Sequence, residues 1–272
     1  MAELFVVPIS TGGQFVGTTA SHDPKDSNIY LLTFTSGADN RLTPEFLDAF
    51  LTSLDILEHR FPKGVVITTS GIQKFFSNGL DLEKALTTEG FFDNHLYKLF
   101  RRLLTYPMPT VALVNGHAFA GGFMTAMYHD FRVQNPSKGF VCLNEIVLEI
   151  PLTPPMRTVF LDKIKDGPTI RSIIVEGKRF AGQEALRLGI VDALGGLEEA
   201  VKFVHERKLL DIGKSSAFVA LKEGLWKRTL DAIDNKEAND AFDKRNQDWR
   251  ENYVSEAQKR VQLWESKKGA KL

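Results

Sequence analysis

Buried strand patterns alternate with helical patterns in the N-terminal part of the chain. NIYLLTFTS, starting at Asn28, mixes β-branched and aromatic residues, and KGVVITTS (residues 63–70) and VALV (residues 111–114) are similar apolar runs. Each run is followed by a loop that contains glycine and then by a helical pattern. Strands that are joined through helices are typical of layered α/β proteins, so we predict an α/β fold.

The first predicted helix has a clear start. Thr43 is a good N-cap residue, and Pro44 suits the first helical position. Apolar residues then recur at helical spacing, at Phe46, Phe50, Leu54 and Leu57. A second helix is predicted over residues 91–104.

The composition changes after Gly196, where the chain becomes rich in Lys, Glu, Asp and Asn. We therefore predict an α/β core over residues 1–196 and a helical C-terminal region, which serves oligomerisation, over residues 197–272. Large aromatic surfaces on charged helices pack either on the core or on a neighbouring subunit. This region has five such residues, namely Trp226, Phe242, Trp249, Tyr253 and Trp264.

Charge and chain ends limit the possible partners. Lys and Arg number 34, as do Asp and Glu, so net charge gives no reason to expect a nucleic acid partner. No apolar run is long enough to span a membrane. The chain ends in Ala270, Lys271 and Leu272, which is similar to the S-K-L peroxisomal address. This ending predicts a peroxisomal location and an import receptor as partner.

Two turns that contain glycine are candidates for binding an oxyanion. FFSNGLDL (residues 75–82) follows one strand, and NGHAFAGGFMTA (residues 115–126) follows another. Gly121 and Gly122 open a helix, so their N–H groups lack helical partners, and a further free N–H is expected near Leu80. Two such donors on one oxygen would stabilise an enolate formed from a thioester.

Other common chemistries lack their motifs in this sequence. There is no G-x-G-x-x-G after a strand, no G-x-x-x-x-G-K-[ST] and no G-x-S-x-G elbow. No Cys/His grouping or H-E-x-x-H indicates a metal site, so no metal is expected.

Glu145 and Glu149 lie within KGFVCLNEIVLEIPL (residues 138–152), which resembles a buried strand and its exit. A carboxylate in apolar surroundings costs several kcal/mol to ionise unless it finds a partner, so its pKa rises. We expect Phe123, Met124, Ile146 and Val147 to supply these surroundings for Glu145. Glu149 is an even number of residues away and could share its strand face.

Five motifs in this order and spacing resemble the crotonase (enoyl-CoA hydratase/isomerase) superfamily: FSNGLDL, VALVNGHAFAGG, HDFRV, CLNEIVLEIPL and EGKRFAGQEALRLGIVDAL. The resemblance extends from about Asn28 to Leu194. It implies a spiral of strand-strand-helix units, with a C-terminal helical region that forms trimers or hexamers.

The resemblance also implies roles for individual residues. It makes the N–H groups of Leu80 and Gly121 the oxyanion hole and Glu145 the catalytic base. ADNRL (residues 38–42) would line the path of coenzyme A, with Arg41 able to meet a phosphate. The residues implied in substrate binding are Ala38, Arg41, Ser77, Asn78, Gly79, Asp81 and Gly122.

The function implied is that of a delta-3,delta-2-enoyl-CoA isomerase of fatty acid β-oxidation. Hydratases of this superfamily typically hold two glutamates. In this sequence the position of the first glutamate is occupied by Met124, or by Thr125 if the register is shifted by one residue. One carboxylate suffices to move a proton along an acyl chain. The substrate is then an acyl-CoA, and no separate cofactor is expected because coenzyme A is part of the substrate. A 2-enoyl-CoA hydratase, a dual hydratase/isomerase and a non-catalytic acyl-CoA-binding protein stay open as alternatives.

Overall fold

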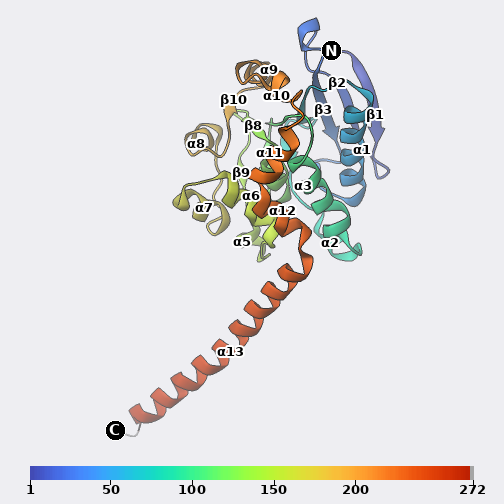
Figure 1. The fold of residues 1–272 in the computed structure, drawn as a ribbon. Helices are drawn as coiled ribbons and strands as arrows, with labels where there is room; N and C mark the ends of the chain where they lie inside the picture. The colour runs from blue at the N-terminus through green and yellow to red at the C-terminus, as the bar shows by residue number, and fades with distance from the viewer. Residues whose placement is uncertain (270–272) are drawn as a thin grey trace.

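The computed structural model describes residues 1–269, which form two β-sheets with helices packed around them (Figure 1). The strands are β1 (Glu3–Pro8), β2 (Gln14–Thr19), β3 (Ile29–Thr35), β4 (Val65–Ser70), β5 (Phe75–Ser77), β6 (Thr110–Val114), β7 (His117–Phe119), β8 (Phe131–Gln134), β9 (Val141–Cys142) and β10 (Ala193–Leu194).

Helices follow most of these strands. The helical elements up to residue 187 are η1 (Pro24–Asp26), α1 (Pro44–Arg60), α2 (Leu82–Thr87), the π-helical turn η2 (Phe92–Leu96), α3 (Tyr97–Leu104), α4 (Gly121–Tyr128), α5 (Glu145–Leu148), α6 (Pro154–Lys163), α7 (Gly167–Ile174) and α8 (Gly182–Arg187). Those that follow are α9 (Leu197–Glu206), α10 (Leu209–Ile212), α11 (Phe218–Leu225), α12 (Lys227–Asp234) and α13 (Lys236–Gly269).

The larger sheet has the strand order β1-β2-β3-β4-β6-β8-β10. The pairs β1·β2 and β2·β3 are antiparallel, and the remaining pairs are parallel. Every residue of β4 and of β6 is buried, which explains why their apolar residues are consecutive, at Val65–Ile67 and Val111–Val114, rather than alternating.

The smaller sheet, β5-β7-β9, is parallel and gives the fold its repeat. In each repeat a strand of the larger sheet is followed by a strand of the smaller sheet and then by a helix. The three repeats are β4-β5-α2, β6-β7-α4 and β8-β9-α5. These are the predicted strand-strand-helix units, and the α/β fold class is confirmed.

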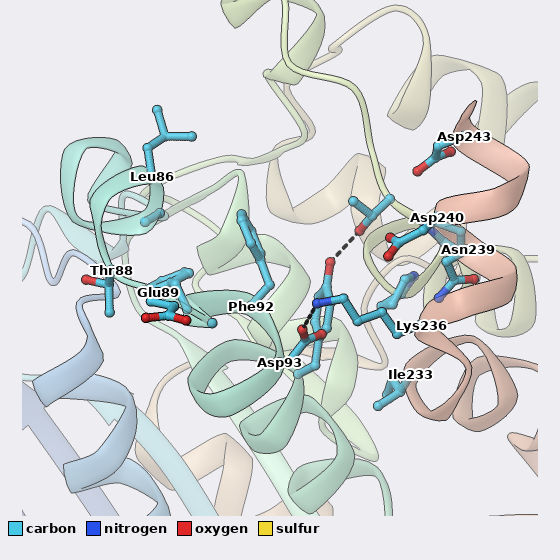
Figure 2. Close-up of a pocket in the computed structure, with 17 residues that line it drawn as sticks. Leu86, Thr88, Glu89, Phe92, Asp93, Ile233, Lys236, Asn239, Asp240 and Asp243 are labelled. Atoms are coloured by element: carbon cyan, nitrogen blue, oxygen red, sulfur yellow. Dashed lines mark hydrogen bonds and ion pairs between the residues drawn. The ribbon is translucent and has the colours of Figure 1, made fainter. Parts of the chain in front are cut away.

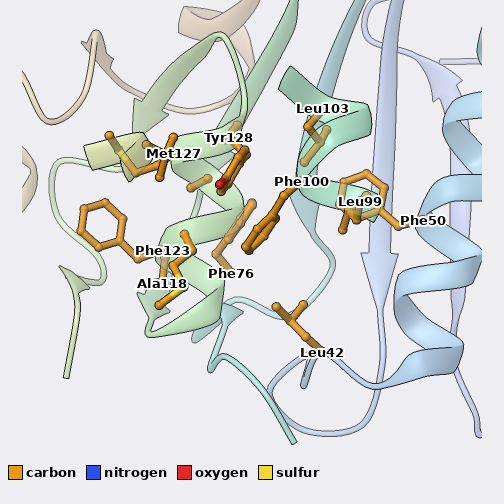
Figure 3. Packing of buried hydrophobic residues seen from close by; sticks show 14 of the residues in the cluster. Leu42, Phe50, Phe76, Leu99, Phe100, Leu103, Ala118, Phe123, Met127 and Tyr128 are labelled. Atoms are coloured by element: carbon orange, nitrogen blue, oxygen red, sulfur yellow. The ribbon is translucent and has the colours of Figure 1, made fainter. Parts of the chain in front are cut away.

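The larger of two hydrophobic clusters among the described residues includes the helices next to the smaller sheet (Figure 3). The rings of Phe100 and Tyr128 stack with centroids 4.0 Å apart, and both are fully buried. Phe123 packs edge-on against Phe160 of α6. Helix α4 is buried at every residue, so its first turn is held firmly by the core.

The predictions for individual elements succeed except at one place. The strands starting near Asn28 and at residues 63–70 and 111–114 form, and Thr43 caps α1 through a bond from the Phe46 N–H. The predicted buried strand within residues 138–152 is confirmed only over β9 (Val141–Cys142). Its strand portion ends at Cys142, and residues Glu145–Leu148 form the short helix α5.

All elements that the structure describes after Leu194 are helical. Lys222 of α11 forms a buried ion pair with Asp130, which attaches this region to the core. Trp226 packs against the core, whereas α13 projects away from the body, with Trp249 and Tyr253 exposed (Figure 1). No helix among residues 1–269 has the length and apolar character to cross a membrane. The predicted targeting tripeptide, residues 270–272, lies outside the described residues.

Candidate active site

The residues predicted to do chemistry follow the three strands of the smaller sheet. Leu80 comes shortly after β5, Gly121 after β7 and Glu145 after β9. Because these strands are parallel and adjacent, their carboxyl ends share one edge of the sheet. In open α/β sheets ligands bind outside the carboxyl ends of strands, so this edge is the candidate site.

The N–H of Leu80 is directed by its neighbours in the chain. It belongs to the peptide that joins Gly79 to Leu80, and the carbonyl of that peptide accepts a bond from the Leu42 N–H at 2.9 Å. The N–H and C=O of a trans peptide point in opposite directions. Holding the Gly79 carbonyl against Leu42 therefore turns the Leu80 N–H away from that segment. Within the described residues this N–H has no backbone acceptor.

The N–H of Gly121 is directed by an unusual turn. Ala120 has φ 49° and ψ −123°, a conformation that favours glycine and costs about 1–3 kcal/mol in other residues. Its carbonyl accepts from the Met124 N–H at 3.0 Å, and its own N–H donates to the Cys142 carbonyl at 2.9 Å. These bonds hold the strained turn, which leaves the Gly121 N–H at the free N-terminus of α4.

The two donor loops touch each other. Gly79 has φ +83°, and a Cβ atom there would lie 2.9 Å from the Ala120 Cβ and 3.1 Å from the Gly121 nitrogen. A Cβ atom on Gly121 would lie 3.1 Å from Cδ2 of Leu80. Glycine at both positions thus allows the approach that brings two N–H donors to one cavity, as an oxyanion hole needs.

Glu145 is buried beside these loops, with only 6% of its surface exposed. Its Oε2 atom has no hydrogen-bond partner among the described residues. Burial raises its pKa from the ordinary value of 4.5 to about 7, and the opposing effect of its own backbone N–H is smaller. A base with a pKa near the working pH can both take and return a proton.

These groups line one cavity of about 280 Å³. Its wall is made by Arg41, Asn78, Leu80, Leu82, Ala120, Gly121, Met124, Asn144, Glu145, Leu148, Ile150 and Met156. The expectation that Ile146 and Val147 surround Glu145 is wrong, because these side chains are 54% and 76% exposed. Helix α5 turns them outward. The predicted Met124 does line the cavity, with Leu148 and Ile150, whereas Phe123 is buried but does not line it.

The predicted substrate-binding residues divide into two groups. Arg41 and Asn78 line the cavity, whereas the other five do not, namely Ala38, Ser77, Gly79, Asp81 and Gly122. Ala38 is exposed in a turn. The remaining four support the loops. Ser77 donates to the Asn40 carbonyl, Asp81 caps α2, and Gly122 packs so closely that a Cβ atom would lie 2.4 Å from the Ser77 carbonyl oxygen.

Glu149 does not share a face with Glu145. It is exposed in the left-handed conformation, with φ 56°, at the end of α5, because the segment is helical rather than extended. Asn144, in contrast, was not predicted and lines the cavity, and its buried Oδ1 has no hydrogen-bond partner within residues 1–269. The sequence held no signal for Asn144 beyond its position next to Glu145.

A second cavity, of about 430 Å³, lies between α2, η2 and the start of α13 (Figure 2). Asp93, Asp240 and Asp243 line it, and Lys236 pairs with Asp93. This acidic lining would repel the phosphates of coenzyme A, so the cavity at Glu145 is the better candidate. Among residues 1–269, no group of three or more His, Cys, Asp or Glu side chains is arranged to hold a metal ion.

Comparison with known proteins identifies the fold. The family model described as enoyl-CoA hydratase/isomerase matches residues 24–260. The chain belongs to the enoyl-CoA hydratase/isomerase family. The predicted resemblance to the crotonase superfamily is thus confirmed.

Relatives within the enoyl-CoA hydratase/isomerase family include two from Arabidopsis thaliana. Enoyl-CoA delta isomerase 3 is 28% identical over 222 residues, which cover 77% of this chain and 93% of the relative. Enoyl-CoA delta isomerase 1, peroxisomal, is 31% identical over 216 residues, with 76% and 89% covered. The crystal structure of human mitochondrial delta3-delta2-enoyl-CoA isomerase superposes with a TM-score of 0.67 at 25% identity and covers 84% of this chain and 95% of that chain.

Proposed function

We propose that this chain is an enoyl-CoA isomerase that converts 3-enoyl-CoA to 2-trans-enoyl-CoA in fatty acid β-oxidation. One observation carries the proposal: of the residues that line the cavity, Glu145 alone has a carboxylate. Moving a double bond within a chain needs one group that takes a proton and returns it elsewhere. The isomerase names of the relatives support the same reaction.

The reaction follows from the placement of these groups. The thioester oxygen binds to the N–H groups of Leu80 and Gly121. The carboxylate of Glu145 takes a proton from C2 of the acyl chain, and the electron pair moves to the thioester oxygen to form a dienolate. The electrons then return to form the C2–C3 double bond as the Glu145 carboxyl delivers the same proton to C4. Coenzyme A enters as part of the substrate, and no further cofactor is proposed.

An isotope experiment tests this proton transfer. We expect 3-enoyl-CoA deuterated at C2 to yield product with deuterium at C4, since one carboxyl carries the label between them. Glu145→Gln keeps the size of the side chain but removes the base, and we expect turnover to fall about 100- to 10,000-fold. Glu149→Gln removes an exposed carboxylate from the opposite end of α5 and serves as the matched control. Unchanged turnover in Glu145→Gln would refute the role of this residue.

A second activity, hydration of 2-enoyl-CoA, is favoured by Asn144. Its buried Oδ1 has no hydrogen-bond partner among the residues that the structure describes, and an acyl chain offers it no hydrogen-bond donor. A water between Asn144 and Glu145 would satisfy both oxygens, and this water could add to C3 while Glu145 carries a proton from it to C2. Asn144→Leu should lower hydration at least tenfold and leave isomerisation within threefold. Equal loss of both activities would contradict a water site.

A peroxisomal location is proposed from two lines of support. Enoyl-CoA delta isomerases 1 and 2 from Arabidopsis are both named as peroxisomal, and the last three residues of this sequence are Ala270, Lys271 and Leu272. The test is to delete these three residues from a chain that carries a fluorescent protein at its N-terminus. The intact fusion should co-localise with a peroxisomal marker, and the deleted one should not.

Assembly into a homotrimer or hexamer is proposed from α13. This helix of 34 residues has large apolar side chains that are exposed in the single chain, among them Trp249 at 62% and Tyr253 at 49%. Soluble monomers rarely expose such surfaces. Light scattering should give the mass of three or six chains, and a monomer would refute the proposal.

A further inference from the structure

Arg41 contacts the loop that supplies the first oxyanion donor. Its Nη1 donates to the carbonyls of Asn78, at 3.1 Å, and of Leu80, at 3.2 Å. These carbonyls flank the Gly79–Leu80 peptide, whose own carbonyl is held by the Leu42 N–H. One guanidinium group therefore bridges the two sides of the peptide whose N–H faces the cavity.

Asp39 holds the guanidinium group in place. Its Oδ2 accepts from Arg41 Nε at 2.9 Å and from Asn78 Nδ2 at 2.7 Å, and its backbone carbonyl accepts from the Asn78 N–H at 2.9 Å. The carboxylate also compensates the positive charge of Arg41, which weakens any attraction of this side chain for a distant phosphate. The sequence suggested a phosphate contact, whereas these bonds direct the side chain to the loop.

We propose that Arg41 is a positioning residue, which fixes the Leu80 N–H on the thioester oxygen by clamping the Asn78 and Leu80 carbonyls. The proposal rests on the proposed isomerase function. Without the guanidinium group the two carbonyls lose their shared donor, and the peptide between them can tilt. Because a displacement of about 1 Å at a reacting centre can cost about 100-fold in rate, we expect kcat to fall about 10- to 100-fold.

Truncated substrates separate this role from a phosphate contact. Arg41→Met, which keeps much of the aliphatic length, is compared with the parent on a 3-enoyl-CoA and on the same acyl group carried by pantetheine, which has no phosphate. Positioning predicts the same fall in kcat on both substrates. A phosphate contact predicts instead a raised KM with the CoA thioester and no change with the pantetheine thioester, and this result would overturn the proposal.

Further variants at Arg41 and a control at another arginine complete the experiment. Arg41→Ala should regain part of its kcat when guanidinium ion is added at millimolar concentration, because the free ion can donate to both carbonyls. Arg41→Lys offers a single ammonium group, and its kcat should lie between those of the parent and of Arg41→Met. If circular dichroism shows that Arg41→Met does not fold, Arg41→Lys replaces it in the comparison of the two substrates. Arg187→Met, at an exposed arginine on α8, is the matched control and should leave both constants unchanged.

The outcomes for the two proposals can be told apart. A parent protein that isomerises neither substrate would refute the proposed function. A parent that isomerises both, with Arg41→Met unchanged in kcat, would refute only the positioning role of Arg41.

Discussion

Burial of Glu145 should make the protein less stable as the pH rises, and Glu145→Gln should remove this dependence. Glu145 is buried, with 6% of the residue exposed, and burial raises its pKa from 4.5 to about 7. At about 1.36 kcal/mol for each pH unit, this rise disfavours the charged form in the folded state by about 3 kcal/mol. The proposed base would thus reduce stability at the pH where it acts.

The sign follows from which state holds the proton more tightly. The folded state binds the proton better, so Glu145 stabilises the fold fully below pH 4.5, and this contribution is lost as the pH rises through about 7. Glutamine does not titrate. Between about pH 5 and about pH 8 the free energy of unfolding of Glu145→Gln should therefore rise relative to the parent by about 2.5 kcal/mol.

Urea unfolding at both pH values, followed by circular dichroism, measures this change. The comparison uses the change between the two pH values because the buried amide of glutamine adds its own cost, which does not vary with pH. Glu149→Gln is the control and should stay within about 0.5 kcal/mol of the parent. A relative change below about 0.5 kcal/mol for Glu145→Gln would refute the argument that burial raises this pKa.

Substitutions at Gly121 and Gly79 test the supports of the site, and one at Lys222 tests the attachment of the helical C-terminal region to the core. Gly121→Pro and Gly121→Ala both add a Cβ atom, but only proline removes the N–H. The kcat of the proline variant should therefore be about 100- to 1000-fold below that of the alanine variant. A ratio under tenfold would contradict the oxyanion hole. Gly79→Ala should lower turnover about 100-fold by pushing the donor loops apart. The control is Gly189→Ala, because Gly189 has φ +68° and its new Cβ atom would have nothing within 4 Å. This control should lose stability but no turnover. Lys222→Ala leaves the carboxylate of Asp130 buried without its ion pair, and urea unfolding should show a loss of about 3–5 kcal/mol.

The sequence predicts the strands and donor loops well because each carries a local signal. The runs that became β4 and β6 contain consecutive apolar residues, at Val65–Ile67 and Val111–Val114, as expected of strands covered on both faces. Gly79 marks a place where another backbone approaches closely, and Gly121 one where the Leu80 side chain does, and glycine permits both approaches. Both signals depend on a residue and its immediate neighbours, so they can be read without the fold.

The surroundings of Glu145 could not be predicted in the same way. An apolar run as short as that around Glu145 fits a strand and a buried helical turn equally well. The choice was decided by tertiary structure, since β9 ends at Cys142 and the chain turns into α5. Ala120 is a second case, because a positive φ normally indicates glycine, and only the surrounding hydrogen bonds hold alanine in that conformation.

The strand order of the smaller sheet also determines how a substrate can lie. Neighbouring strands are about 4.8 Å apart, and β7 lies between β5 and β9. Donors that follow β5 and β7 can therefore meet on one oxygen between these strands, while Glu145 lies beyond β7 on the far side. A thioester held by Leu80 and Gly121 must then extend its acyl carbons from the β5 side toward β9. In that direction C2 comes first and C4 after it, and both carbons lie near the carboxyl of Glu145. If the thioester binds as proposed, the order of three short strands is sufficient to place Glu145 beside the two carbons between which a double-bond shift moves a proton.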